Sequence, residues 1–206
     1  MHIALQFRQN DFQEIVSLID ASPFANLVTT GSHGPEVNHL PLIRQGDTQG
    51  NLRLIGHFAK GNPAGQALEG QPVLAVFQGP SAYISPTWYD MQNAVPTWNY
   101  LAVHVTGTAR IVSDPQQAMA HLTAMVDRFE RTQPAPWTME QTEPGFIEQL
   151  LAGIIPFEIT PTAVNAQWKL SQHHDAPRRA RTAAALRQAG GPDQIAIADW
   201  MNRTQK

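Results

Sequence analysis

Residues 25–58, ANLVTTGSHGPEVNHLPLIRQGDTQGNLRLIGHF, decide the fold. Three short runs rich in apolar and β-branched residues, at 25–30, 37–43 and 52–58, are typical of strands. They are separated by GSHGPE and RQGDTQGN, which are rich in the residues that turns favour. Because short turns join strands that run in opposite directions, the stretch predicts an antiparallel meander of three strands.

Further strands are predicted after this meander, as apolar or alternating runs at 72–79, 100–112, 154–160 and 163–171. Helical patterns lie between or after these runs and do not alternate strictly with them, which is typical of an antiparallel barrel. The predicted fold class is therefore mainly β with added helices (α+β), an antiparallel split β-barrel. We expect a single domain over 1–206 with a helical C-terminal tail from about residue 175.

The helices of this fold are predicted from their capping signals. Asn10 or Asp11 can cap a first helix, and Asn62 and Asp114 each stand directly before a proline at the first helical position. The tail from residue 175 is rich in Ala, Arg and Gln, and the Gly-Gly-Pro sequence at 190–192 should break it into two helices.

The composition limits the kinds of site that the chain can form. It has no cysteine, so it can form no disulfide, thiolate metal site or cysteine nucleophile, and it suits a reducing cytoplasm. Neither a signal peptide nor a run of about 20 apolar residues is found, so no membrane contact is expected. The net charge of −3 argues against a general nucleic-acid coat.

Several enzyme classes have no support, because the chain lacks their catalytic or cofactor-binding motifs. The chain contains no Gly-x-Ser-x-Gly elbow, no P-loop and no dinucleotide-binding glycine fingerprint. His173 and His174 could suggest a metal site, but adjacent residues of a strand point to opposite sides and a third ligand is missing nearby. No metal is therefore expected.

GHFAKGNP (56–63) has the residues of an anion site. His57 ends a predicted strand, Lys60 follows in a glycine-flanked loop, and Asn62 opens a short helix. The alternative is an ordinary capped turn with a solvated lysine. His39, in the preceding segment NHLPL, should approach His57 if their strands are antiparallel neighbours.

Two aromatic segments, YISPTWY (83–89) and VPTWNY (95–100), could form the wall of a ring-binding site. Their prolines prevent a regular helix, and Ser85, Thr97 and Asn99 supply hydrogen-bond donors and acceptors. So many aromatic residues with few charges also favour a homodimer interface, although a loop held by its own tryptophans would give the same pattern.

WKLSQ (168–172) follows an apolar strand. Alternation would place Lys169 and Ser171 on one face, where they could contact a phosphate or a flavin ring from a partner subunit. An exposed strand end is the alternative interpretation.

Four motifs resemble, in this order, those of the PaiB-like family of FMN-binding negative transcriptional regulators: GHFAKGNP (56–63), GPSAYISPTWY (79–89), VPTWNY (95–100) and WKLSQ (168–172). The resemblance runs from about Phe7 to Leu186. It implies a split barrel like that of pyridoxamine 5'-phosphate oxidase, with FMN as the cofactor at a homodimer interface. The family pattern ends in asparagine where this chain has His173. The residues implied to bind the cofactor are His39, Leu40, Pro41, His57, Phe58, Ala59, Lys60, Asn62, Tyr83, Ser85, Trp88, Thr97, Trp98, Asn99, Lys169, Ser171 and Gln172.

Three functions remain open from the sequence. The first is FMN binding with a flavin-dependent redox or sensing role, and the family name implies negative regulation of transcription. The second is a DNA-binding repressor without flavin chemistry, for which the only basic cluster is Arg178, Arg179, Arg181 and Arg187. The third is a haem protein in which His104 or His173 ligates iron. No catalytic residue is identified, since no acid–base pair stands out.

Overall fold

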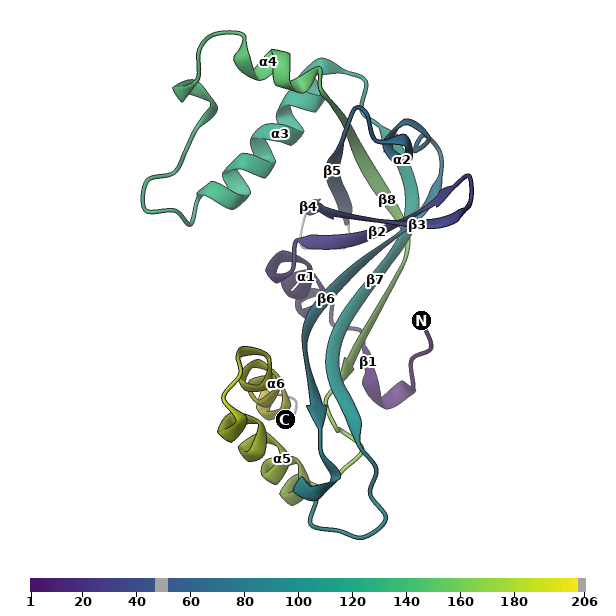
Figure 1. The fold of residues 1–206 in the computed structure, drawn as a ribbon, viewed down its shortest axis with the longest axis vertical. Helices are drawn as coiled ribbons and strands as arrows, with labels where there is room; N and C mark the ends of the chain where they lie inside the picture. Colours follow the sequence, from purple (N-terminus) through teal and green to yellow (C-terminus); the bar gives the residue numbers. More distant parts are fainter. Residues whose placement is uncertain (47–51, 204–206) are drawn as a thin grey trace. The chain divides into compact units, whose positions relative to one another are not determined.

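The structure, a computed structural model, describes residues 1–46 and 52–203 (Figure 1). Within it, the chain forms two compact units. Unit 1 consists of residues 1–21, 78–104 and 165–206, and unit 2 of residues 22–77 and 105–164, less those outside the described ranges. The expectation of a single domain stays a prediction.

The described strands form one antiparallel sheet in the order β3-β2-β6-β7-β8-β5-β4, and β1 pairs with β8. Three of the strands, β6, β7 and β8, are long and contribute residues to both units. The bounds are β1 Arg8–Gln9, β2 Phe24–Gly31, β3 Gly34–Pro41, β4 Ile43–Gln45, β5 Arg53–Ala59, β6 Pro72–Ile84, β7 Thr97–Ile111 and β8 Ile154–Lys169.

In unit 2 the sheet curls into a half-barrel, since β3 approaches β5 although the two lie far apart in the strand order. The meander was predicted correctly only for β2 and β3, which pair over their full length across the turn at Ser32 and His33. The predicted strand 37–43 breaks at the fully buried Leu42, whose N–H bonds to the Pro23 carbonyl. Its end becomes β4, which pairs with β5. The predicted turn after it lies partly outside the described residues.

The last strand also differs from the prediction. The run at 154–160 and most of the run at 163–171 form one continuous strand, β8, which ends at Lys169. Its pairing with β5 ends at Ile159, opposite Leu54. Pro161 therefore lies beyond the ladder with β5, where its missing N–H costs no hydrogen bond to that strand.

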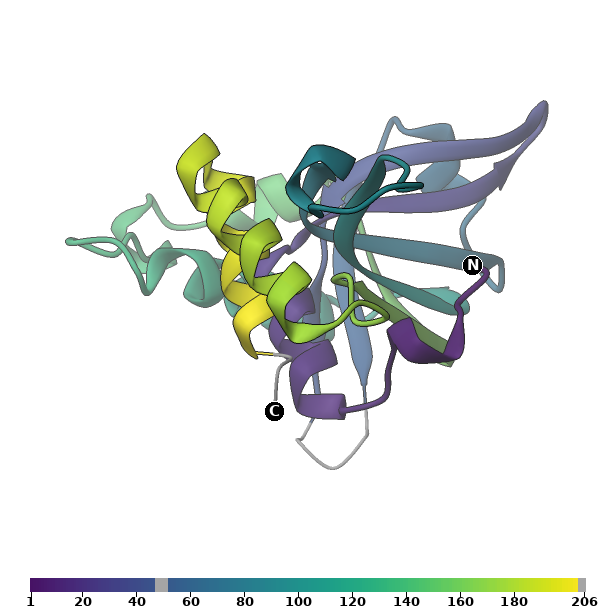
Figure 2. The same cartoon turned by 90° about the horizontal axis from the view of Figure 1, so that it is seen from below.

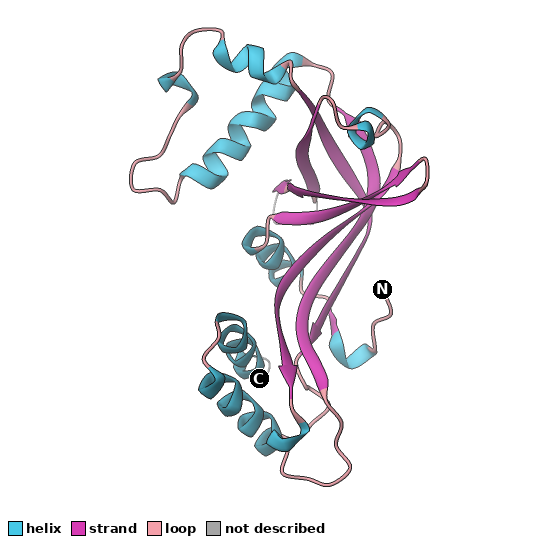
Figure 3. Cartoon of the chain, in the orientation of Figure 1, coloured by secondary structure: helices cyan, strands magenta, loops and turns pink. Residues whose placement is uncertain are grey.

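Figure 3 shows the helices in cyan. Those with predicted caps begin where the caps predict. Asp11 accepts the N–H groups of the first turn of α1, and Asn62 and Asp114 do the same for α2 and α3. In the C-terminal tail, Gly190 has a φ of 75°, a left-handed conformation that ends α5 before α6 begins. The bounds are α1 Phe12–Ala21, α2 Pro63–Gln66, α3 Pro115–Glu130, α4 Phe146–Leu151, α5 Ala176–Ala189 and α6 Pro192–Arg203, with 3-10 turns η1 Leu5–Phe7, η2 Pro86–Trp88 and η3 Met139–Gln141.

Unit 1 is built around the pair α5 and α6, which lie side by side in Figures 1 and 2 and contact each other. Leu18 of α1 packs against Gly79 of β6, where a Cβ would lie only 2.7 Å from the leucine side chain. This close approach requires glycine at residue 79. None of the described helices is both long and apolar enough to cross a membrane.

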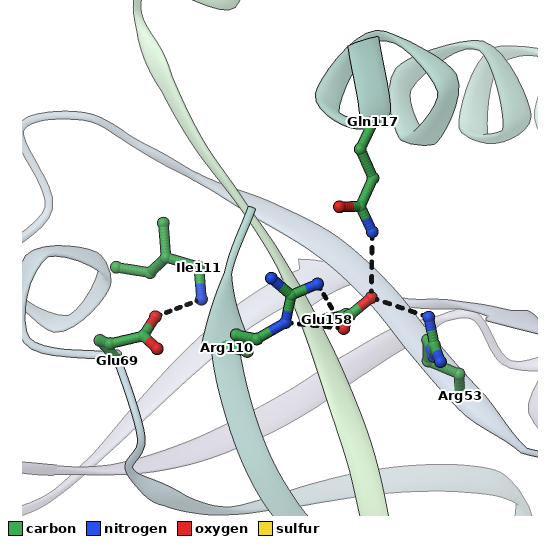
Figure 4. A network of polar contacts seen from close by, with 6 residues as sticks. All are labelled: Arg53, Glu69, Arg110, Ile111, Gln117 and Glu158. Atoms are coloured by element: carbon green, nitrogen blue, oxygen red, sulfur yellow. Dashed lines mark hydrogen bonds and ion pairs between the residues drawn. The ribbon is translucent and has the colours of Figure 1, made fainter. Parts of the chain in front are cut away.

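Unit 2 contains a buried charge network on β8 (Figure 4). Glu158 is only 5% exposed, and its carboxylate accepts two bonds from Arg110, at 2.9 and 2.8 Å, and one from Arg53, at 3.1 Å. Gln117 of α3 donates a longer bond of 3.4 Å. The network therefore joins β5, β7, β8 and α3 and neutralises the buried carboxylate.

Candidate functional site

The segment GHFAKGNP forms the end of β5, a turn and the start of α2 in unit 2. The Lys60 backbone is held on both sides, because its N–H bonds to the Gly153 carbonyl and its own carbonyl accepts from Gln66. The side chain is exposed, and no ion pair to it is found among the described residues. A rigid backbone thus presents an unneutralised ammonium group.

The neighbours of Lys60 have different environments. The Nδ1 atom of His57 is buried without a hydrogen-bond partner among the described residues, and burial lowers the pKa of this imidazole. The ring is therefore neutral near pH 7. Phe58 instead packs inside the core, 5.3 Å from the Phe157 ring, while Ala59 is exposed at the strand end.

The strands of His39 and His57 are not the hydrogen-bonded neighbours that the sequence suggested, although β3 approaches β5. The strand of His39, β3, pairs with β2, and the His39 ring stacks on Phe24 at 6.5 Å. Asn38 is the side chain of this segment that contacts the loop after β5, because its Oδ1 accepts from Asn62 Nδ2 at 3.3 Å. Sequence reasoning missed Asn38, although strand alternation places it on the opposite side from His39. Of the other predicted residues here, Leu40 is buried and Pro41 is half-buried.

In unit 1, two of the predicted aromatic residues are exposed on adjacent strands. Tyr83 of β6 is 46% exposed and Trp98 of β7 is 56% exposed, and their rings meet edge to face at 6.1 Å. The predicted aromatic loop is thus shorter than expected, since these residues belong to strands. Ser85 caps η2 by accepting the Thr87 N–H, and Trp88 ends that turn half-buried.

Asn99 and Ser171 form an internal contact. Both are fully buried, and Asn99 Nδ2 donates to Ser171 Oγ at 3.0 Å. The predicted shared face of Lys169 and Ser171 is wrong, because β8 ends at Lys169 and Ser171 has a φ of 63°. Gln172 bonds to the backbone of Trp168 and Leu170 and so closes this turn.

Two of the residues implied to bind the cofactor, Lys169 and Thr97, contact each other, with Lys169 Nζ donating to Thr97 Oγ1 at 2.6 Å. Both line a pocket of about 400 Å³ that lies wholly within unit 1. Burial lowers the pKa of Lys169. The pocket is lined by Gln6, Phe7, Tyr89, Met91, Asn93, Ala94, Val95, Pro96, Thr97, Lys169, His173, His174 and Arg178.

Sequence reasoning did not find most of this pocket. His173 and His174 were expected on opposite sides of a strand, but they follow β8 in a turn and their rings lie 3.8 Å apart. Phe7 meets His173 at 5.6 Å, and Tyr89 meets His174 at 4.9 Å. The order of these four rings depends on contacts between segments far apart in the chain. Among the described residues, no three His, Asp or Glu side chains gather as metal ligands would.

The four arginines of the predicted basic cluster on α5 each have a contact within unit 1, although Arg181 and Arg187 are exposed. Arg179 is 8% exposed and donates to the Met201 carbonyl, Arg181 donates to the Tyr89 carbonyl, and Arg187 pairs with Asp199. Arg178 faces the pocket of unit 1, where one of its Nη atoms lies 2.8 Å from His174 Nδ1. Each guanidinium therefore has a role within its own unit.

Two solved structures define the class of fold. The flavocytochrome Anf3 from Azotobacter vinelandii has a TM-score of 0.64 at 18% identity, with 81% of this chain and 72% of that chain covered. The FAD and heme binding protein from Mycobacterium smegmatis has a TM-score of 0.59 at 18% identity, covering 89% and 80%. The fold is therefore the split barrel of flavin-binding proteins, which confirms the predicted α+β class.

The sequence then identifies the family. Residues 1–163 match the family model described as "Putative FMN-binding domain". Over 203 residues the chain is 34% identical to the "Protease synthase and sporulation protein PAI 2" of Bacillus subtilis, covering 98% of this chain and 96% of that protein. The chain belongs to the PaiB-like family of flavin-binding proteins, as the four motifs predicted.

Proposed function

We propose that the chain binds FMN and that Lys60 contacts its phosphate. The exposed ammonium of Lys60, held on a rigid backbone without a neutralising carboxylate among the described residues, is the observation that carries this proposal. The neutral His57 beside it adds a hydrogen-bonding group with no protein partner among the described residues. A dianionic phosphate suits such a cation, because charge-assisted hydrogen bonds are the strong ones.

The flavin would lie at a homodimer interface. Support comes from exposed apolar side chains in unit 1, where Tyr83, Val95 and Trp98 are 46%, 74% and 56% exposed. Such side chains are enriched in the cores of interfaces, and a second copy would cover them. The other predicted cofactor residues stay proposals, with Asn99, Ser171 and Gln172 acting by shaping the turn after β8.

A bound flavin supplies one- or two-electron transfer, and the proposed role is therefore redox chemistry or redox sensing. This chain's own residues would bind and orient the cofactor. The expected compartment is the cytoplasm, which suits a chain without cysteine.

The phosphate contact is tested by titrating FMN against the Lys60→Ala protein and following flavin fluorescence. Loss of one charge-assisted contact should weaken binding by about ten- to a hundredfold. Arg131→Ala, which removes an exposed cation of the same unit, is the matched control and should leave the affinity unchanged. Equal dissociation constants for the wild-type and Lys60→Ala proteins would remove Lys60 from the site.

The nature of the cofactor and the dimer are tested on the purified protein. The absorbance spectrum should show flavin bands, and sedimentation should show a dimer at micromolar concentration. A Soret band would favour the haem alternative, and a stable monomer would contradict the interface.

A direct role in binding DNA has no support from α5. Since Arg179, Arg181 and Arg187 are bonded within unit 1, they present no broad basic face to phosphates. We expect no tight, sequence-specific DNA binding at physiological salt. A nanomolar complex with a promoter fragment that Arg178→Ala abolishes would reverse this ranking.

A further inference from the structure

The pocket of unit 1 has the size and lining of a ligand site. Its volume of about 400 Å³ falls within the range of about 300–1,000 Å³ that small-molecule pockets occupy. Phe7, Tyr89 and the two neighbouring histidines, whose ring planes are tilted by 43°, form a wall of four rings. Flat rings pack well against such a wall.

Charge at this pocket is positive and poorly neutralised. Lys169 and Arg178 both line it, and no acidic side chain is among the described residues that do so. The nearest acid recorded for Arg178 is Asp175, whose carboxylate is 4.0 Å away and whose side chain is 62% exposed. An exposed contact at that distance contributes little. Thr97 bonds to Lys169 but carries no charge.

The two histidines do not add positive charge near pH 7. Burial, followed by Lys169 and Arg178, lowers the pKa of His173. Burial, His173 and Arg178 lower the pKa of His174 to about 4, although Asp175 acts in the opposite direction. The nearby cations keep both imidazoles neutral. His174 Nδ1 then accepts from Arg178, which leaves the Nε2–H of that ring as a donor.

The buried hydroxyl of Tyr89 is a further feature of the pocket, separate from its two cations. Its side chain is only 3% exposed, and its hydroxyl is buried without a hydrogen-bond partner of good geometry among the described residues. Burial raises the pKa of this hydroxyl, while Ser171 and Arg178 act against the rise, so it stays protonated and can donate. Tyr89 also lines the pocket, so its hydroxyl is a candidate donor to a bound acceptor.

We propose that this pocket binds an organic anion, a phosphate or carboxylate carried on a flat ring, with Lys169 and Arg178 holding the charge and the aromatic wall contacting the ring. The same chemistry has two possible sources. One is a small molecule separate from the flavin, and the other is the phosphate of the flavin itself.

The experiment is a calorimetric titration with phenyl phosphate, and benzyl alcohol serves as the neutral comparison. Full-length protein is used in two arms, stripped of flavin and saturated with FMN. Arg178→Gln and Lys169→Gln should each weaken binding of phenyl phosphate at least tenfold. Arg187→Gln, which removes the same charge from the same helix at a position outside the pocket, should change it less than twofold.

Binding in both arms would assign the pocket to a separate anion. Binding only in the flavin-free arm, together with weaker FMN binding by Arg178→Gln, would assign it to the flavin phosphate. The proposal is overturned if phenyl phosphate binds no better than benzyl alcohol, or if Arg178→Gln and Lys169→Gln keep the wild-type affinity. The wild-type FMN titration is a separate measurement, so failure of the proposed function would be recognised independently.

Discussion

Each unit contains a pair of cations, and the two pairs have opposite surroundings. In unit 2, Arg53 and Arg110 bond to Glu158, a carboxylate that is 5% exposed. In unit 1, Lys169 and Arg178 line a pocket whose described lining contains no acid. The first pair is neutralised by the protein itself, and the second is left for a ligand.

This difference distinguishes charges that stabilise the fold from charges that are free to attract a ligand. A buried carboxylate is tolerated only where partners compensate for its lost hydration, so removing a member of the Glu158 network should destabilise the unit. An unneutralised cation beside a pocket contributes little to folding and keeps its full attraction for an anion. Substitutions should therefore affect folding in unit 2 and ligand binding in unit 1.

The largest effect on stability is expected for Glu158→Ala. This change leaves two arginines and Gln117 without their shared acceptor and removes the link between the sheet and α3. We expect a loss of about 2–4 kcal/mol in the free energy of unfolding, reduced from the value for a fully buried pair because both arginines are half-exposed. Chemical denaturation measures it, and a loss below about 1 kcal/mol would contradict a structural role.

A matched pair of variants compares the units directly. Arg110→Gln removes two short bonds to a buried carboxylate and should cost about 1–2 kcal/mol. Arg178→Gln should cost less than about 1 kcal/mol, because its one acid contact is exposed and 4.0 Å long. Denaturation curves of the two proteins give the loss in the free energy of unfolding for each variant. A larger loss for Arg178→Gln than for Arg110→Gln would contradict the proposed difference between the units.

The smallest effect concerns pH. The pKa of His174 falls from 6.5 to about 4 on folding, so between these values the unfolded chain binds more protons. The free energy of unfolding should therefore decrease as the pH falls from 6.5 toward 4 and should not depend on this group above 6.5. For the His174→Gln protein, the free energy of unfolding should change less steeply with pH between 6.5 and 4. Identical slopes would show that His174 is not held neutral.

The fold could be predicted largely from local signals. Asn62 and Asp114 cap their helices, and the tail breaks at Gly190, because capping and left-handed turns depend on a few neighbouring residues. The prediction failed at Leu42 and across Pro161. In both places, strand pairing between distant segments decided whether the chain bends or continues.

The candidate sites divide in the same way. By itself, the sequence determined the family, the split-barrel class and the motif around Lys60, because motif residues contiguous in the chain are held close together by the chain itself. Only the tertiary structure decided that Asn38 contacts Asn62, that Ser171 is buried against Asn99, and that Tyr89 and Arg178 share a pocket with Lys169. Such groupings depend on which strand and helix faces pack together. Hydrophobic burial and hydrogen bonding over the whole unit determine that packing, so it cannot be predicted from a short stretch of sequence.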